Sequence, residues 1–273
     1  MMRAMPLPAL VGRSFSRAAA VFTAVAAILA GFQVLLVLVA TSFQQTRSFD
    51  LLSSIVPISL QRSLGPGALM LASFPGMVTF GYFHPIVVLA VLQAAVYLAT
   101  EPAGEVEWAL FDLELSRPVA RHWIVTRSLV LAFGLTTAVV LVMALGTWAG
   151  LTVFAPPNAS WPAPARVASL GAHLLLLSWS FAAAGLAVSS ATHRRGTAFT
   201  IVAVTAVSLY LLNFVADVWT PAARIRWISP FYYFPGFAVA NGTAPIARDL
   251  LLLAVPTVAL SAVAYWQFNR RDL

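Results

Sequence analysis

Apolar residues occur in long uninterrupted runs along this chain, separated by shorter segments that hold most of the charged residues. A helix needs about 20 apolar residues to cross a hydrocarbon core of roughly 30 Å, and six runs are long enough. None of the six contains Arg or Lys. They cover residues 20–43, 77–99, 128–153, 167–190, 197–219 and 250–268. The pattern predicts an all-α membrane protein of six transmembrane helices that form one domain over residues 1–273.

The composition agrees with this class and excludes several kinds of chemistry. Of the 273 residues, 60% are hydrophobic and 9% are charged, whereas about a quarter of the residues are charged in a soluble domain. All basic residues are arginine, so the chain lacks the Lys of a Walker A phosphate loop. It has no cysteine, and neither H-E-x-x-H nor G-x-S-x-G occurs. We therefore expect no catalytic residues, no metal site and no cofactor in this chain.

The arginines indicate the orientation of the spans. The net charge of +7 would suggest nucleic acid in a soluble protein. Here the arginines flank the apolar runs, so we expect no nucleic acid partner. Arginines on the predicted inner side are Arg3, Arg13, Arg17, Arg117, Arg121, Arg127, Arg194, Arg195, Arg270 and Arg271, and those on the outer side are Arg47, Arg62, Arg166, Arg224, Arg226 and Arg248. Because cytoplasmic loops carry the excess of basic residues, both termini are predicted to be inside.

Residues 1–19 precede the first span and show a helical pattern of their own. Leu7, Leu10 and Val11 share one face, while Arg13 and Arg17 lie on another. This pattern predicts a short interfacial helix on the inner leaflet, and a frayed tail is the alternative.

Aromatic residues are concentrated in the last outer loop, residues 220–247, among prolines. They are typical either of an aromatic belt at the membrane interface or of a re-entrant segment, and both interpretations stay open. Asp217, His84 and His173 lie near outer span ends, where we expect their side chains to reach water.

Small and polar residues inside the spans suggest how the helices pack. Gly146 and Gly150 form a G-x-x-x-G pattern that permits close helix contact. Polar residues such as Gln33, Thr136 and Ser178 are expected to form hydrogen bonds between helices.

The inner loop between spans two and three holds five of the nine acidic residues. A helix over residues 101–116 would place Glu105 and Asp112 on one stripe and Glu107 and Glu114 on the opposite stripe. Two apolar flanks remain, one with Val106, Leu110 and Leu113 and the other with Trp108, Phe111 and Leu115. One flank can lie on the membrane domain, and the other needs a second protein to cover it. An amphipathic helix on the membrane surface is the alternative.

The same loop resembles the membrane-spanning permeases of type-2 ABC exporters. The resemblance lies in the run from Glu101 through Gly104 and Glu105 to Glu107 and in the turn Ser116–Arg121 before span three. Weaker similarities are Phe83–Pro85 at span two, Ser229–Tyr233 in the last outer loop and the ending Phe268–Leu273. With six spans in matching order, the resemblance extends over the whole chain.

The resemblance implies a function and a set of partners. Residues 101–116 would be the coupling helix that docks on a separate ABC ATPase, through Glu105, Glu107, Trp108, Leu110, Phe111, Asp112, Glu114 and Leu115. The N-terminal helix would be the connecting helix, and the loop after span five would fold back into the membrane. Two ATPase copies, which hold ATP and Mg²⁺, and a second permease, identical or related, would complete an exporter in the lipid bilayer of a plasma membrane, here a bacterial inner membrane. A membrane-embedded enzyme or assembly factor that recruits another cytosolic protein through the acidic loop is the alternative function.

Overall fold

The computed structural model describes residues 7–46, 48, 49, 70–107 and 122–270, and within these ranges the chain is helical with no strand. Six helical segments are long and apolar enough to cross a membrane. They are Ala18–Gln45, Phe74–Ala99, His122–Phe154, Pro164–Ala191, Arg195–Val215 and Ile246–Arg270. The predicted fold class, a helical multi-pass membrane protein with six spans, is confirmed at this level.

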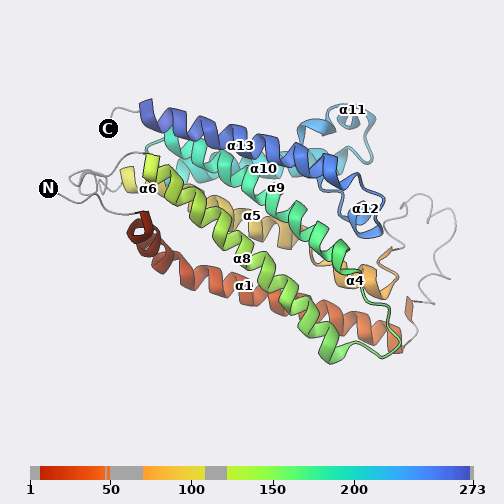
Figure 1. The fold of residues 1–273 in the computed structure, drawn as a ribbon. Coiled ribbons are helices and arrows are strands. Elements are labelled where there is room, and N and C mark those ends of the chain that lie inside the picture. The colour runs from red at the N-terminus through yellow and green to blue at the C-terminus, as the bar shows by residue number, and fades with distance from the viewer. Residues whose placement is uncertain (1–6, 47, 50–69, 108–121, 271–273) are drawn as a thin grey trace.

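The long helices run side by side in one bundle (Figure 1). They are α1 (Leu7–Gln45), α5 (Pro85–Ala99), α8 (His122–Phe154), α9 (Pro164–Ala191), α10 (Arg195–Val215) and α13 (Ile246–Arg270). The shorter helices are α4 (Phe74–Phe80), α6 (Glu101–Glu107), α11 (Thr220–Ala223), η1 (Arg226–Ile228), η2 (Pro230–Tyr233) and α12 (Gly236–Asn241). The start of α1, the end of α13 and α6 lie at one end, called here the termini end, and α4, α11 and α12 lie at the distal end.

Helix α9 is the centre of the bundle. It packs against α5, α8, α10 and α13, whereas α1 packs mainly on α8. In the most apolar segment of α9, 67% of the residues are buried, against 17% in α10 and in α13. Leu170, Leu174, Leu177 and Leu186 of α9 are fully buried. Helices α5, α8, α10 and α13 therefore surround α9, and the outer helices present apolar side chains outward, as a bilayer requires.

The G-x-x-x-G pattern makes the predicted close contact, and its partner is α1. A Cβ atom at Gly146 would lie 2.8 Å from the carbonyl oxygen of Ala30 and 3.0 Å from its Cα. A Cβ atom at Gly150 would lie 3.2 Å from Val37. No side chain fits between the two backbones at Gly146, so glycine sets the distance between α1 and α8.

Hydrogen bonds between side chains connect α8 to α9 and to the turn between α4 and α5. The hydroxyl groups of Tyr82 and Thr147 are 2.9 Å apart, and Trp179 Nε1 donates to Thr136 Oγ1 at 3.1 Å. Thr136 thus confirms the expected polar contact between helices. Ser178 instead donates to Leu174 O within its own helix, and both amide atoms of Gln33 are buried without a hydrogen bond. A hydrogen bond between two transmembrane helices, such as that from Trp179 to Thr136, contributes about 1 kcal/mol.

Two predicted boundaries differ from the structure. The second span is interrupted between α4 and α5, because Pro85 has no N–H and disfavours helical backbone at His84. His84 is extended, with φ −59° and ψ 129°, and its Nδ1 accepts a hydrogen bond from Ile86 N at 3.3 Å. The described residues before the first span are helical and continuous with it, since α1 runs from Leu7 without a break. Their position on the membrane surface stays a prediction. Figure 1 shows the first turns of α1 at an angle to the rest.

The glycine contact yields a stability prediction. Gly146→Ala should lower the free energy of unfolding by about 1–3 kcal/mol, because the added methyl group forces two backbones apart. Gly134→Ala is the matched control on the same helix, since no atom lies within 4 Å of its added Cβ. Thermal unfolding of both variants in the same detergent measures the difference. Equal melting temperatures would contradict the proposed role of Gly146.

Candidate functional site

Helix α6 follows α5 directly and is embedded in the termini end of the bundle. Thr100 ends α5, and its hydroxyl donates to Val96 O at 3.0 Å. Four of the seven residues of α6 are buried, namely Pro102, Ala103, Gly104 and Glu105. This acidic segment is therefore partly enclosed by the chain's own helices.

A buried ion pair joins α6 to α8. Arg127 Nη2 donates to Glu105 Oε2 at 2.7 Å, and the two side chains are 2% and 5% exposed. Both side chains are almost excluded from solvent, so the pairing stabilises both charges. Removing one partner of such a pair costs about 3–5 kcal/mol, because it leaves a buried charge uncompensated.

Two further hydrogen bonds join α6 to α9 and α10. Ala103 N donates to Ser189 Oγ of α9 at 2.9 Å. Arg195 N, at the first residue of α10, donates to Glu107 Oε2 at 3.0 Å. A carboxylate at a helix N-terminus satisfies a free N–H and interacts favourably with the helix dipole.

The side chain of Arg195 completes the contact by crossing α6 to reach α5. Its Nη2 donates to Tyr97 O at 2.8 Å, and its guanidinium carbon lies 4.1 Å from the centre of the Tyr97 ring. A Cβ atom at Gly104 would lie 3.0 Å from Arg195 Cδ. The glycine thus leaves room for the arginine. We call the contacts of α6 with α5, α8, α9 and α10 the α6 junction.

The structure locates only part of the sequence-predicted coupling residues. Glu105 and Glu107 point to different helices, α8 and α10, in agreement with their predicted opposite stripes. Val106 packs against the main core of the bundle. Trp108, Leu110, Phe111, Asp112, Glu114 and Leu115 lie outside the described residues. Arg127 is a residue of the α6 junction that the sequence interpretation missed, because it was assigned only a role in topology.

At the distal end, the aromatic segment after α10 has inward and outward rings. Phe231 and Phe234 are 5% and 8% exposed, and Trp227 is 60% exposed. Phe231 contacts the rings of Phe181 and Tyr210, which belong to α9 and α10. The inward rings therefore attach the segment to the bundle.

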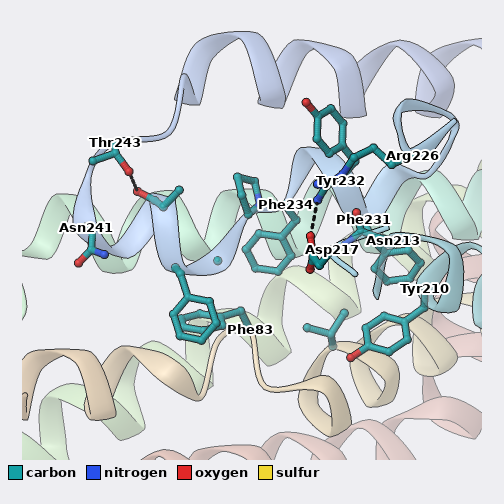
Figure 2. Close-up of a pocket in the computed structure, with 15 residues that line it drawn as sticks. Phe83, Tyr210, Asn213, Asp217, Arg226, Phe231, Tyr232, Phe234, Asn241 and Thr243 are labelled. Carbon is teal, nitrogen blue, oxygen red and sulfur yellow. Dashed lines mark hydrogen bonds and ion pairs between the residues drawn. The ribbon is translucent and has the colours of Figure 1, made fainter. Parts of the chain in front are cut away.

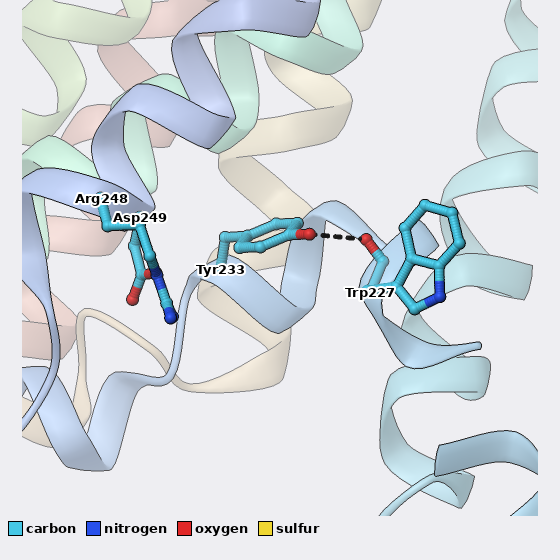
Figure 3. Close-up of polar contacts among 4 residues, drawn as sticks. All are labelled: Trp227, Tyr233, Arg248 and Asp249. Carbon is cyan, nitrogen blue, oxygen red and sulfur yellow. Dashed lines mark hydrogen bonds and ion pairs between the residues drawn. The ribbon is translucent and has the colours of Figure 1, made fainter. Parts of the chain in front are cut away.

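Hydrogen bonds fix the shape of this segment. Ser229 Oγ donates to Leu209 O of α10 at 2.8 Å. Tyr233 Oη donates to Trp227 O at 2.8 Å and links η2 to η1 (Figure 3). Near the start of α13, Arg248 donates to Asp249 Oδ1 at 2.8 Å. The segment is thus a series of short helices held by side-chain contacts.

The three polar residues predicted to reach water behave differently. Asp217 is exposed and pairs with Arg226, with 3.2 Å between Oδ1 and Nη2. His84 is half-buried and contacts Phe32 and Phe80. The expectation is wrong for His173, which is 0% exposed because Phe234 stacks over its ring.

A pocket of about 600 Å³ lies between α10, η2 and α12 (Figure 2). Its middle is formed by aromatic rings that include Phe83 and Phe234. Asn241 and Thr243 are at one end in Figure 2, and Asp217, Asn213 and Tyr210 are at the other. A pocket of this size, apolar with a few polar groups, is typical of small-molecule sites. Among the described residues, no group of three or more His, Asp or Glu side chains could hold a metal ion.

Comparison with protein-family models, with curated proteins and with solved structures finds no match for this chain. The function is therefore argued from the residues and their geometry.

The α6 junction yields a prediction about stability. Glu105→Ala should destabilise the protein by about 3–5 kcal/mol, since it removes the buried carboxylate that Arg127 Nη2 binds. The double variant Glu105→Leu with Arg127→Met should recover most of this loss, because an apolar pair of similar volume replaces both charges. Glu107→Ala is the control and should cost much less, since Glu107 is exposed. Thermal unfolding measures all three variants. A Glu105→Ala effect no larger than that of Glu107→Ala would show that the pair contributes nothing.

Proposed function

We propose that this chain is the membrane-spanning permease of a type-2 ABC exporter and transmits the motion of a separate ATPase through α6. The observation that carries the proposal is the α6 junction. A loop that only recruits a protein needs a surface, whereas a loop that transmits force needs rigid attachment to the spans. Here one short helix contacts four spans through a buried ion pair and backbone hydrogen bonds.

The contacts of the α6 junction give a physical role to residues of the acidic pattern on which the resemblance rests. Glu105 forms the ion pair, Gly104 gives space to Arg195, and Glu107 binds the start of α10. Each role needs the residue type found at that position. The pattern is therefore consistent with a junction that couples the loop after Glu107 to the bundle.

In the proposed mechanism, ATP and Mg²⁺ bind to two partner ATPase subunits, and their closure moves residues 108–116. The junction passes this movement to α8 and α10, and the bundle, together with a second permease, changes the side from which its path is accessible. The chain itself has no Lys and no phosphate loop, so we propose that it does not hydrolyse ATP. It would occupy a bacterial inner membrane, with the termini end in the cytoplasm.

The orientation can be tested with single cysteines, because the chain has none of its own. Asn158 and Arg194 are both exposed, and they lie in loops at the two ends of α9. In intact cells, a membrane-impermeant maleimide should label Asn158→Cys, while Arg194→Cys should react only after lysis. The reverse pattern would contradict the orientation and the cytoplasmic position of α6.

The partner can be tested by co-purification. We expect an ATPase with a Walker A motif to be recovered in equal amount with the chain. Phe111→Ala should weaken this complex by roughly 30-fold, since truncation of one central aromatic anchor costs about 2 kcal/mol or more. Leu110→Ala is the comparison on the opposite flank and should retain the partner.

Three outcomes of this test bear on the proposal. If only Leu110→Ala loses the ATPase, residues 101–116 are correctly assigned as the coupling helix, but the flank with Leu110 contacts the ATPase instead of the flank with Phe111. If both variants retain the ATPase at the unmodified level, these residues do not couple to it. A chain that is active without any ATPase would contradict the proposed function and favour an enzyme or assembly factor.

A further inference from the structure

The distal pocket contains a balanced pair of charges at one end. Asp217 and Arg226 both line it and form an ion pair, with side chains that are 61% and 30% exposed. Among the residues that the structure describes, no other acidic or basic side chain lines the pocket. Because the two charges cancel, a ligand with a net charge gains little long-range attraction. A neutral ligand, or one with both charges, fits this balance better.

The position of Arg226 is fixed by an aromatic ring. Its guanidinium carbon lies 4.7 Å from the centre of the Tyr232 ring, which also lines the pocket. This cation–π contact holds the charge beside Asp217 before any ligand binds. A preorganised group loses less conformational freedom on binding.

One donor and one acceptor at this end lack partners within the described chain. Arg226 Nε and Asn213 Oδ1 are buried and form no hydrogen bond. A buried polar atom without a partner costs about 1–3 kcal/mol. A ligand that draws these side chains toward the cavity, and offers an acceptor to Arg226 and a donor to Asn213, would recover this cost.

Exposed apolar residues neighbour the charged end of the pocket in the sequence. Val218 and Trp219, in the turn between α10 and α11, and Trp227 of η1 are 86%, 59% and 60% exposed. Tryptophan favours the level of the lipid headgroups. Within the pocket, Phe83 and Phe234 form an apolar floor next to the charged end (Figure 2).

We propose that the distal pocket binds a zwitterionic amphiphile, with its phosphate or carboxylate on Arg226, its primary ammonium on Asp217 and Asn213, and its apolar part on the aromatic rings. The chemistry fits the headgroup of an aminophospholipid and also a soluble zwitterion. The site depends only on the distal pocket, so it stands whether or not the chain works with an ATPase.

The test measures lipid binding to the purified full-length chain by native mass spectrometry. Phosphatidylethanolamine should bind about tenfold more tightly than phosphatidylglycerol, which lacks the ammonium and hence one charge-assisted hydrogen bond. Arg226→Gln should weaken the binding of phosphatidylethanolamine about tenfold. Arg224→Gln is the matched control, since it removes an exposed arginine two residues away that does not line the pocket, and it should change binding by less than about twofold.

A second variant tests the preference itself and does not depend on absolute affinity. Asp217→Asn leaves Arg226 without its counter-charge, so phosphatidylglycerol should then bind at least as well as phosphatidylethanolamine. Equal binding of the two lipids to the unmodified chain, no change of preference in Asp217→Asn, or equal losses in Arg224→Gln and Arg226→Gln would overturn the proposal.

Glycerophosphoethanolamine, the same headgroup without acyl chains, separates the two sources. Competition with phosphatidylethanolamine at similar concentration supports a soluble zwitterion as the occupant. Competition only at concentrations at least about 100-fold higher supports a lipid, because buried acyl groups then supply much of the affinity.

Discussion

The ion pair between Glu105 and Arg127 is the contact on which the arrangement of the termini end depends. A helix of seven residues is too short to be stable alone, so α6 exists because its neighbours hold it. Of those contacts, the ion pair has the largest consequence if broken, because both charges are enclosed. An apolar pair could hold α6 as firmly. A charged pair also fixes which residue of α6 faces α8, since any other register would separate Glu105 Oε2 from Arg127 Nη2.

The rest of the bundle is held by contacts that function in lipid, where apolar burial does not favour one helix surface over another. Helix α1 lies against α8 because Gly146 and Gly150 permit it, and Tyr82, Thr136 and Thr147 add polar bonds between helices. The glycines thus join α8 to α1, whereas Thr136 and Thr147 join α8 to α9 and to the turn between α4 and α5. By contrast, α10 is mostly exposed, and its described polar contacts to other elements lie near its two ends.

The sequence predicts the six spans well because length and apolarity alone decide whether a segment can cross a bilayer. The sequence predicts a close helix contact at Gly146 and Gly150, but it does not predict that α1 is the partner. A motif in one helix does not identify the helix that packs against it. The helix is interrupted before Pro85 because proline disfavours helical backbone at the preceding residue. The pattern of apolar residues does not reveal this interruption, because it continues from α4 into α5. His173 was misjudged because its position near a span end suggested exposure, whereas Phe234 from a distant part of the sequence covers its ring. Arg127 was used only as a sign of topology, and its burial against α6 is a tertiary contact that the charge count does not predict.

Helix α10 connects the two regions that are proposed to be functional. Its first residue, Arg195, binds Glu107 of α6, and Asn213 near its last turn lines the distal pocket. A helix of 21 residues extends about 32 Å and transmits an axial displacement with little compression. Because α10 is the helix least enclosed by the others, together with α13, it can shift against α9 with less loss of packing than α5 or α8. In the proposed exporter, a movement of α6 would therefore reach Asp217 and the aromatic segment through α10 first. The ion pair between Asp217 and Arg226 would then form or break as the ATPase changes state, which links ligand binding in the pocket to the transport cycle.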